Sequence, residues 1–209
     1  MSPRLIACLA FLTLAGILAL QALADGPPPT PEAPAGVSSS GAIAASGEPG
    51  QPLHISGQVF APDGVTPVAG VIVYAYQTDA VGHYQNDPTT HVARLHGWAR
   101  TDERGRFEFL TIRPAPYPSR QVPAHVHFHV WGAGYPLQWT KDLFFADDPL
   151  LKPETIAEAR ESGKFSNVCA ISRDSSRTEI CRINFRLFEE TNYPVQYRQD
   201  PRTRREPVP

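Results

Sequence analysis

The sequence has little of what a helical bundle or a nucleic-acid-binding protein requires. It contains 22 prolines and only 1 methionine in 209 residues. Prolines interrupt helices, so this composition argues against a large helical bundle and favours a loop-rich β protein. Lys+Arg number 19 against 21 Asp+Glu, so no positive excess points to nucleic acid or an anionic membrane as a partner. Hydrophobic residues make up 42% and charged residues 19%, which argues against a wholly disordered chain.

The first 24 residues predict an export signal. Arg4 supplies a positive end, residues 5–20 are apolar throughout, and Ala-Leu-Ala at 22–24 has the small residues that signal peptidase prefers. An uncleaved membrane anchor is the alternative, but the apolar run is short for a span, which needs about 20 residues. We therefore expect a signal peptide over 1–24 and an exported protein, periplasmic or extracellular, with no stable membrane anchor after cleavage.

Composition also predicts the domain boundaries. Residues 25–51 are rich in glycine, proline, alanine and serine and have few large apolar side chains, so a flexible linker is expected there. Residues 198–209 are charged and interrupted by prolines, which predicts an extended C-terminal tail. A single folded domain is expected over 52–197.

Cysteine is scarce, and this scarcity is informative. Of 3 cysteines, Cys8 lies in the export signal, so Cys169 and Cys181 remain in the mature chain. An even pair in an exported protein predicts one disulfide, and the polar residues between the two suit a turn joining two strands. Two free thiols are the alternative, which an oxidising compartment disfavours.

Short β-type runs alternate with turn signals from residue 53 onward. Strands are expected at 54–60, 70–76, 94–101, 106–112, 124–131 and 137–145. One short helix is expected at 153–162, because it begins at a proline, contains alanines and is followed by a glycine. The predicted fold is an all-β sandwich with long loops and this one helix. Similar patterns occur in prealbumin-like binding sandwiches, so they indicate fold and not function.

Residues 124–130 read Ala-His-Val-His-Phe-His-Val. Alternate residues of a strand share a face, so the apolar side chains point into one layer and His125, His127 and His129 point the other way. Histidines at every second position, opposite an apolar face, can form a metal site or have a structural role. The spacing alone supports the two interpretations equally. With imidazoles alone, zinc and copper are as reasonable as iron.

Two tyrosines favour iron. Tyr84 follows a glycine turn just past an expected strand, and Tyr117 lies between prolines that restrict the backbone and aim the phenol. Either tyrosine taken alone is usually a packed aromatic side chain. Two phenolates with two imidazoles suit a ferric ion, because two negative charges compensate three positive ones.

With these residues the chain resembles the intradiol ring-cleavage dioxygenases, the family of protocatechuate and catechol dioxygenases. The resemblance extends over about residues 53–149. It is carried by YQTDAVGHY at 76–84, GWARTD at 97–102, the loop at 111–118, PAHVHF at 123–128 and FFADDP at 144–149. The order of these segments, together with Tyr, Tyr and His-x-His, makes the resemblance specific.

The resemblance implies a mononuclear non-haem Fe(III) cofactor with four protein ligands. Tyr84 and His127 match the family's equatorial ligands, and Tyr117 and His125 match the axial pair. It also implies that Tyr117 is catalytic, because the axial tyrosinate leaves the metal and accepts a proton when a catechol binds. The implied partners are a small aromatic diol and O₂, and the ring opens between the two hydroxylated carbons to a muconate-type diacid.

Three positions depart from the family pattern. Val122 stands where the family has an arginine, with Arg120 two residues earlier, and Asp142 stands where the family tends to have glutamine. His129 is additional, and it either supports a ligand through a hydrogen bond or is exposed. Three interpretations therefore remain: an exported intradiol dioxygenase, a metal-binding relative with altered catalysis, and a prealbumin-like binding module without iron. The oligomeric state and the particular catechol stay open.

Overall fold

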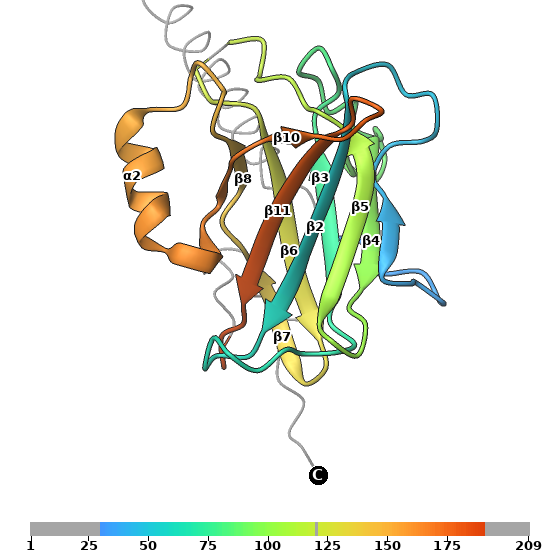
Figure 1. Ribbon diagram of the computed structural model, residues 1–209. Coiled ribbons are helices and arrows are strands. Elements are labelled where there is room, and N and C mark those ends of the chain that lie inside the picture. Colours follow the sequence, from blue (N-terminus) through green and yellow to red (C-terminus); the bar gives the residue numbers. More distant parts are fainter. Residues whose placement is uncertain (1–29, 120, 191–209) are drawn as a thin grey trace, which may run out of the picture.

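Two β-sheets pack face to face in the computed structural model, which describes residues 30–119 and 121–190 (Figure 1). The expected all-β sandwich with a short helix is confirmed. The predicted signal peptide at 1–24 and tail at 198–209, together with Arg120, lie outside the described residues.

The first sheet has the strand order β1-β5-β2-β11-β10. Its central strand β2 pairs antiparallel with β5 and parallel with β11, and β1 pairs parallel with β5. The bounds are β1 Ser40–Ala42, β2 Pro52–Phe60, β5 Arg106–Ile112, β10 Ser172–Arg173 and β11 Glu179–Arg186.

The second sheet has the strand order β4-β3-β6-β8-β9, and β7 also pairs with β6. The bounds are β3 Ile72–Gln77, β4 Leu95–Arg100, β6 His125–Gly132, β7 Tyr135–Trp139, β8 Leu143–Phe145 and β9 Val168–Cys169. The single strand expected at 137–145 is wrong, because β7 and β8 are separate and pair with successive parts of β6. Between them, Thr140 is held by its hydroxyl, which donates to the Phe128 carbonyl at 3.1 Å.

The predicted helix is confirmed as α2, Pro153–Glu161, followed by the 3-10 turn η1, Gly163–Phe165. Pro153 begins α2, where a missing backbone N–H costs nothing. Figure 1 shows α2 beside the sandwich. No helix within the described part of the chain is long and apolar enough to cross a membrane.

The core lies between the two sheets, and β6 shows the expected alternation. Val126, Phe128 and Val130 are buried in it, each with at most 1% of the residue exposed. Every residue of β3 is buried, so the outer face of this strand is covered as well. There Tyr74 and Tyr76 form a second cluster, against which Trp98 and Trp131 pack.

The segment at 25–51 differs from the flexible linker expected from its composition. Residues 40–42 form β1, Ile43 and Ala44 are buried, and Thr30 is 2% exposed. A Cβ atom on Gly41 would overlap the Trp98 carbonyl oxygen, so the small residue is what allows β1 to pass so close to β4. The part of this segment that the structure describes is therefore packed against the sandwich.

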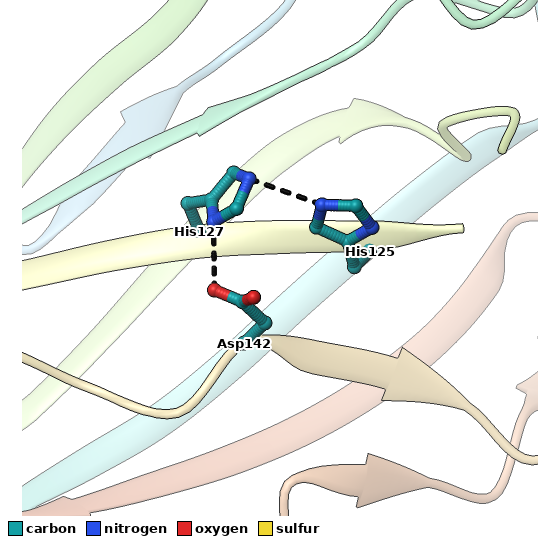
Figure 2. A group of neighbouring side chains, drawn as sticks. All are labelled: His125, His127 and Asp142. Atoms are coloured by element: carbon teal, nitrogen blue, oxygen red, sulfur yellow. Dashed lines mark hydrogen bonds and ion pairs between the residues drawn. The ribbon is translucent and has the colours of Figure 1, made fainter. Parts of the chain in front are cut away.

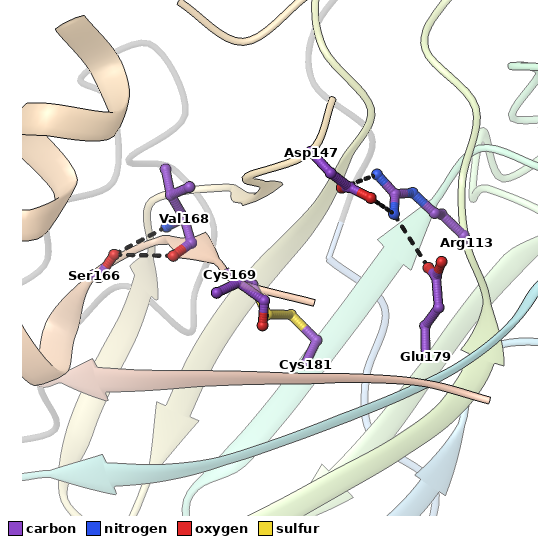
Figure 3. Close-up of a disulfide and its surroundings, with 8 residues drawn as sticks. Arg113, Asp147, Ser166, Val168, Cys169, Glu179 and Cys181 are labelled. Atoms are coloured by element: carbon purple, nitrogen blue, oxygen red, sulfur yellow. Dashed lines mark hydrogen bonds and ion pairs between the residues drawn. A yellow bond between two sulfur atoms is a disulfide. The ribbon is translucent and has the colours of Figure 1, made fainter. Parts of the chain in front are cut away.

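The predicted disulfide between Cys169 and Cys181 is confirmed. Cys169 belongs to β9 in the second sheet and Cys181 to β11 in the first, so the bridge joins the two layers (Figure 3). The expected turn between them lies before β11, where the Asp174 carboxylate accepts hydrogen bonds from the backbone N–H groups of Ser176 and Thr178.

Removing this bridge is expected to destabilise the fold. The variant Cys169→Ser/Cys181→Ser should lose about 3 kcal/mol of free energy of unfolding, because closing a loop of this length restricts the unfolded chain. Urea unfolding followed by tryptophan fluorescence measures the loss. Reduced wild-type protein is the control and should unfold at the same urea concentration as the variant. A variant that unfolds at the same urea concentration as the oxidised wild type would contradict the prediction.

Candidate metal centre

The histidines of β6 lie on the outer face of the second sheet. Tyr76 of β3 is directly opposite His127, and their rings stack with centroids 4.6 Å apart and planes 20° apart. This packing follows from strand register, because paired residues of adjacent strands project from the same face. Tyr76 therefore fixes one side of the His127 ring.

Tyr84 is positioned by a turn organised around Asp79. One carboxylate oxygen of Asp79 accepts from the N–H groups of Val81 and His83, each at 3.0 Å, and the other accepts from Gln85 Nε2 at 2.6 Å. The Tyr84 carbonyl accepts from the Arg94 N–H at 3.0 Å. Hydrogen bonds thus hold the loop between β3 and β4 both before and after Tyr84 in the sequence.

The loop that carries Tyr117 packs on this same turn. The Ala115 N–H donates to the Asp79 carbonyl at 3.0 Å, and the Thr78 hydroxyl donates to the Ala115 carbonyl at 2.7 Å. Gly82 has φ 89°, and a Cβ atom there would overlap the Pro116 carbonyl oxygen. The glycine turn seen in the sequence is thus what permits the two tyrosine loops to touch.

The four predicted ligands come together at one point. The phenol oxygens of Tyr84 and Tyr117 are 2.7 Å apart, and the Nε2 atoms of His125 and His127 are 3.0 Å apart. Tyr84 Oη lies 2.8 Å from His127 Nε2, and Tyr117 Oη lies 3.0 Å from His125 Nε2. Two oxygens and two nitrogens thus form a closed ring of contacts.

Each histidine uses its other ring nitrogen for support. His125 Nδ1 lies 2.7 Å from the Pro123 carbonyl oxygen. His127 Nδ1 lies 2.7 Å from Asp142 Oδ1 (Figure 2). Both partners are acceptors, so each Nδ1 carries the proton and each Nε2 keeps a lone pair directed at the phenols. Each ring therefore has an Nε2 lone pair available to bind a metal ion.

Donor atoms of His125, His127 and Asp142 also lie within 4.8 Å of one another. The Asp142 carboxylate faces the Nδ1 side of His127, whereas the phenols face the Nε2 side. Asp142 therefore supports the His127 ring and does not converge with the other four donor atoms.

Burial dominates the electrostatics of the group. It raises the pKa of Tyr84, an effect reinforced by the neighbouring Tyr117, and it raises the pKa of Tyr117. Burial lowers the pKa of His125, and the adjacent His127 lowers it further. The imidazole is thus favoured as a neutral ligand, and a metal cation would take the place of the phenolic protons. Two phenolates and two neutral imidazoles fit a ferric ion.

A cavity of ≈510 Å³ adjoins this centre. Tyr84, Tyr117 and His127 form one wall, and Asn86, Trp139 and Lys141 lie among the other lining residues. This volume lies within the range of small-molecule sites, roughly 300–1,000 Å³. The centre therefore opens onto a cavity of the size that small-molecule ligands occupy.

His129 does not join the four donors. Its Nδ1 lies 2.6 Å from the Thr30 hydroxyl, and its ring stacks on Trp139 with centroids 5.1 Å apart. Because the residue is only 3% exposed, the alternative of an exposed His129 is wrong. It packs edge-on against Tyr76, which in turn stacks on His127.

Sequence reasoning missed two residues of the centre. Tyr76 could have been found from the alternation in β3, which places it on the outer face beside the histidines. Asp142 was noted only as a departure, and no local pattern pairs it with His127, because the contact depends on the break between β7 and β8. Val122, at the expected arginine position, is 38% exposed.

Comparison with known proteins agrees with this geometry. A family model described as "Dioxygenase" matches residues 26–187. The protocatechuate 3,4-dioxygenase beta chain of Burkholderia cepacia is 32% identical over 123 residues, 53% of this chain and 52% of the relative. The 6-chlorohydroxyquinol 1,2-dioxygenase of Cupriavidus pinatubonensis is 33% identical over 139 residues, 58% of this chain and 50% of the relative.

The chain spans about half the length of the curated relatives it matches. Among solved structures, the dioxygenase domain of a dioxygenase carbohydrate-binding protein fusion from Streptomyces sp. SirexAA-E superposes with a TM-score of 0.57 and 27% identity. That match covers 78% of this chain and 94% of the domain. The matched family and the converging tyrosines and histidines lead to one assignment: the chain belongs to the intradiol ring-cleavage dioxygenase family.

Proposed function

We propose that the protein is an exported non-haem Fe(III) intradiol dioxygenase. It cleaves a catechol-type ring between the two hydroxylated carbons with O₂ and yields a muconate-type diacid. The observation that carries the proposal is the ring of contacts at 2.7–3.0 Å among two phenol oxygens and two Nε2 atoms, next to a cavity of ≈510 Å³.

Tyr84, Tyr117, His125 and His127 would hold the iron, and the bound ion would act as a Lewis acid that prepares the catecholate for reaction with O₂. A catechol must lose two protons to bind through both oxygens. Tyr117 Oη takes one of them, because burial raises its pKa and so makes its phenolate a strong base, and the other is released to solvent through the adjoining cavity. Tyr84 would remain on the ion as a phenolate, and its oxygen, 2.7 Å away, can then accept a hydrogen bond from the protonated Tyr117 hydroxyl.

The decisive experiment combines visible spectroscopy with O₂ uptake. Purified protein loaded with Fe(III) should be reddish, from charge transfer between tyrosinate and iron, and should consume O₂ when a catechol is added. Simple and substituted catechols are assayed in parallel to define the substrate. A colourless iron-loaded protein, or an absence of uptake with every catechol, would overturn the proposal.

A metal-binding relative with altered catalysis is the second candidate. Val122 at the arginine position favours it, since no cation stands at that position to stabilise charge on the reacting substrate. Coloured iron-bound protein without O₂ uptake would select this candidate, and protein that binds no iron would select a prealbumin-like binding module.

Export of the chain is supported by the apolar N-terminal run and by the disulfide, because disulfides persist in oxidising compartments. Intact-mass measurement of the protein from fractionated cells tests it. Export predicts a mature chain that begins at Asp25, and cytosolic protein of unprocessed mass would contradict it.

Replacing Tyr117 with phenylalanine is expected to weaken and shift the visible band, because one of two phenolates is lost. Catalytic turnover should fall about 100-fold or more, since general bases contribute roughly 10²–10⁴-fold. Absorption spectra and kcat at saturating catechol measure the two effects. Tyr135→Phe, in β7, is the control, and an unchanged spectrum in Tyr117→Phe would remove this residue from the coordination sphere.

A further inference from the structure

We propose that Asp142 is a positioning residue that makes His127 the stronger imidazole ligand and biases the centre toward a trivalent ion. The inference rests on the proposed metal site, but it does not depend on turnover of any substrate.

The two histidines have different supports. Both Nδ1 atoms have an acceptor 2.7 Å away, but His125 donates to a neutral backbone carbonyl. His127 donates to the Asp142 carboxylate (Figure 2). A charged acceptor forms the stronger hydrogen bond and draws the N–H proton further from the ring. Electron density at the opposite Nε2 therefore rises more in His127 than in His125.

The position of Asp142 is built into the fold. It lies in the break between β7 and β8, and its carbonyl accepts from Asn167 Nδ2 at 2.8 Å. The Asn167 carbonyl in turn accepts from the Phe144 N–H at 2.8 Å. With Tyr76 stacked on one face of the ring, His127 is held by packing and by the Asp142 hydrogen bond together.

The charge on Asp142 gives the contact a consequence for metal choice. Two phenolates and this carboxylate sum to three negative charges, which balance a trivalent ion and exceed the charge of a divalent one. Because Coulomb attraction scales with the charge of the ion, loss of the carboxylate charge costs a trivalent ion more than a divalent ion. The preference is therefore a property of the carboxylate and not of the hydrogen bond alone.

Two variants separate charge from orientation. Asp142→Asn keeps an amide oxygen that can accept from His127 Nδ1 but removes the charge, and Asp142→Ala removes both. Glu154→Gln removes one exposed carboxylate from α2 and serves as the matched control. Fe(III) and Zn(II) affinities are measured by chelator competition, together with the visible spectrum of the Fe(III) form and a circular dichroism check of folding.

We expect Asp142→Ala to weaken Fe(III) binding by about 10–100-fold, the usual cost of losing the partner behind a metal-binding histidine. Asp142→Asn should lower Fe(III) affinity more than Zn(II) affinity and shift the visible band, while Glu154→Gln matches the wild type. Wild-type Fe(III) affinity and spectrum in both Asp142 variants would overturn the proposal, and an unchanged Fe(III)/Zn(II) ratio in Asp142→Asn would overturn the charge argument.

These results are distinguishable from failure of the proposed function. If the wild type binds Fe(III) but never consumes O₂, the affinity comparison still decides the role of Asp142. If the wild type binds no Fe(III), the proposed function and the trivalent bias both fail. In that case the Zn(II) affinities test only whether Asp142 orients His127. An orienting role requires Asp142→Ala to bind Zn(II) more weakly than Asp142→Asn does.

Discussion

Protein in which His127 is replaced by alanine is expected to bind Fe(III) more than ~100-fold more weakly than the wild type and to lose the visible band. His127 contacts Tyr84 and His125 through Nε2 and Asp142 through Nδ1, so its removal breaks the ring of donors and leaves Asp142 without its partner. The loss should therefore exceed the roughly 10–100-fold cost of removing a residue that only supports a ligand.

Metal analysis after dialysis and O₂ uptake with catechol measure this loss. His54→Ala is a matched control, because His54 is also a strand histidine with a carboxylate partner, Glu108 at 3.0 Å, but it lies in the first sheet. The control should keep iron, colour and activity. A His127→Ala protein that retains stoichiometric iron and its colour would exclude His127 as a ligand.

Replacing Glu179 with alanine is expected to lower the free energy of unfolding by about 3 kcal/mol, at the low end of the cost of breaking a buried ion pair. Glu179 is 2% exposed, and one of its carboxylate oxygens accepts from Arg113 at 3.2 Å (Figure 3). Its other carboxylate oxygen accepts from Arg173 at 2.6 Å. Without it, the Arg113 side chain, 18% exposed, retains the exposed carboxylate of Asp147 as its ion-pair partner among the described residues.

Asp147→Asn provides the comparison, since it removes the other carboxylate from the same arginine. Its side chain is 52% exposed, so solvent screens the pair and the expected loss is below about 1 kcal/mol. Urea unfolding of the two variants measures the difference. Equal losses of free energy of unfolding in the two variants would show that burial does not determine how much each carboxylate contributes to stability.

Arg113 begins the loop that carries Tyr117, so the same cluster connects the stability of the sandwich to the candidate metal centre. The Arg113 N–H donates to the Gln51 carbonyl at 2.8 Å, which ties this loop also to the segment before β2. Visible spectra of iron-loaded Glu179→Ala report whether Tyr117 is displaced.

Features that depend on neighbouring residues were predictable from the sequence. The alternation in β6 placed Val126 and Phe128 in the core and His127 on the other face, because a strand reverses its side chains at every residue. The helix at Pro153 and the pairing of Cys169 with Cys181 also followed from local signals and from the small number of cysteines.

Features that join distant segments were decided by the tertiary structure. Composition predicted a linker up to residue 51, yet β1 pairs with β5 and Thr30 reaches His129, 99 residues away in the sequence. Residue type could not reveal this, because small residues such as glycine occur both in flexible segments and where two backbones approach closely.

The sequence by itself determined which side chains were available for the chemistry: two phenols, two imidazoles spaced to share a face, and two cysteines able to bridge. Only the tertiary structure decided that Gly82 lets the two tyrosine loops meet, and that the break between β7 and β8 places Asp142 behind His127. Side-chain direction within a strand follows from local backbone geometry, whereas the approach of two loops depends on how strands far apart in the chain pair and pack.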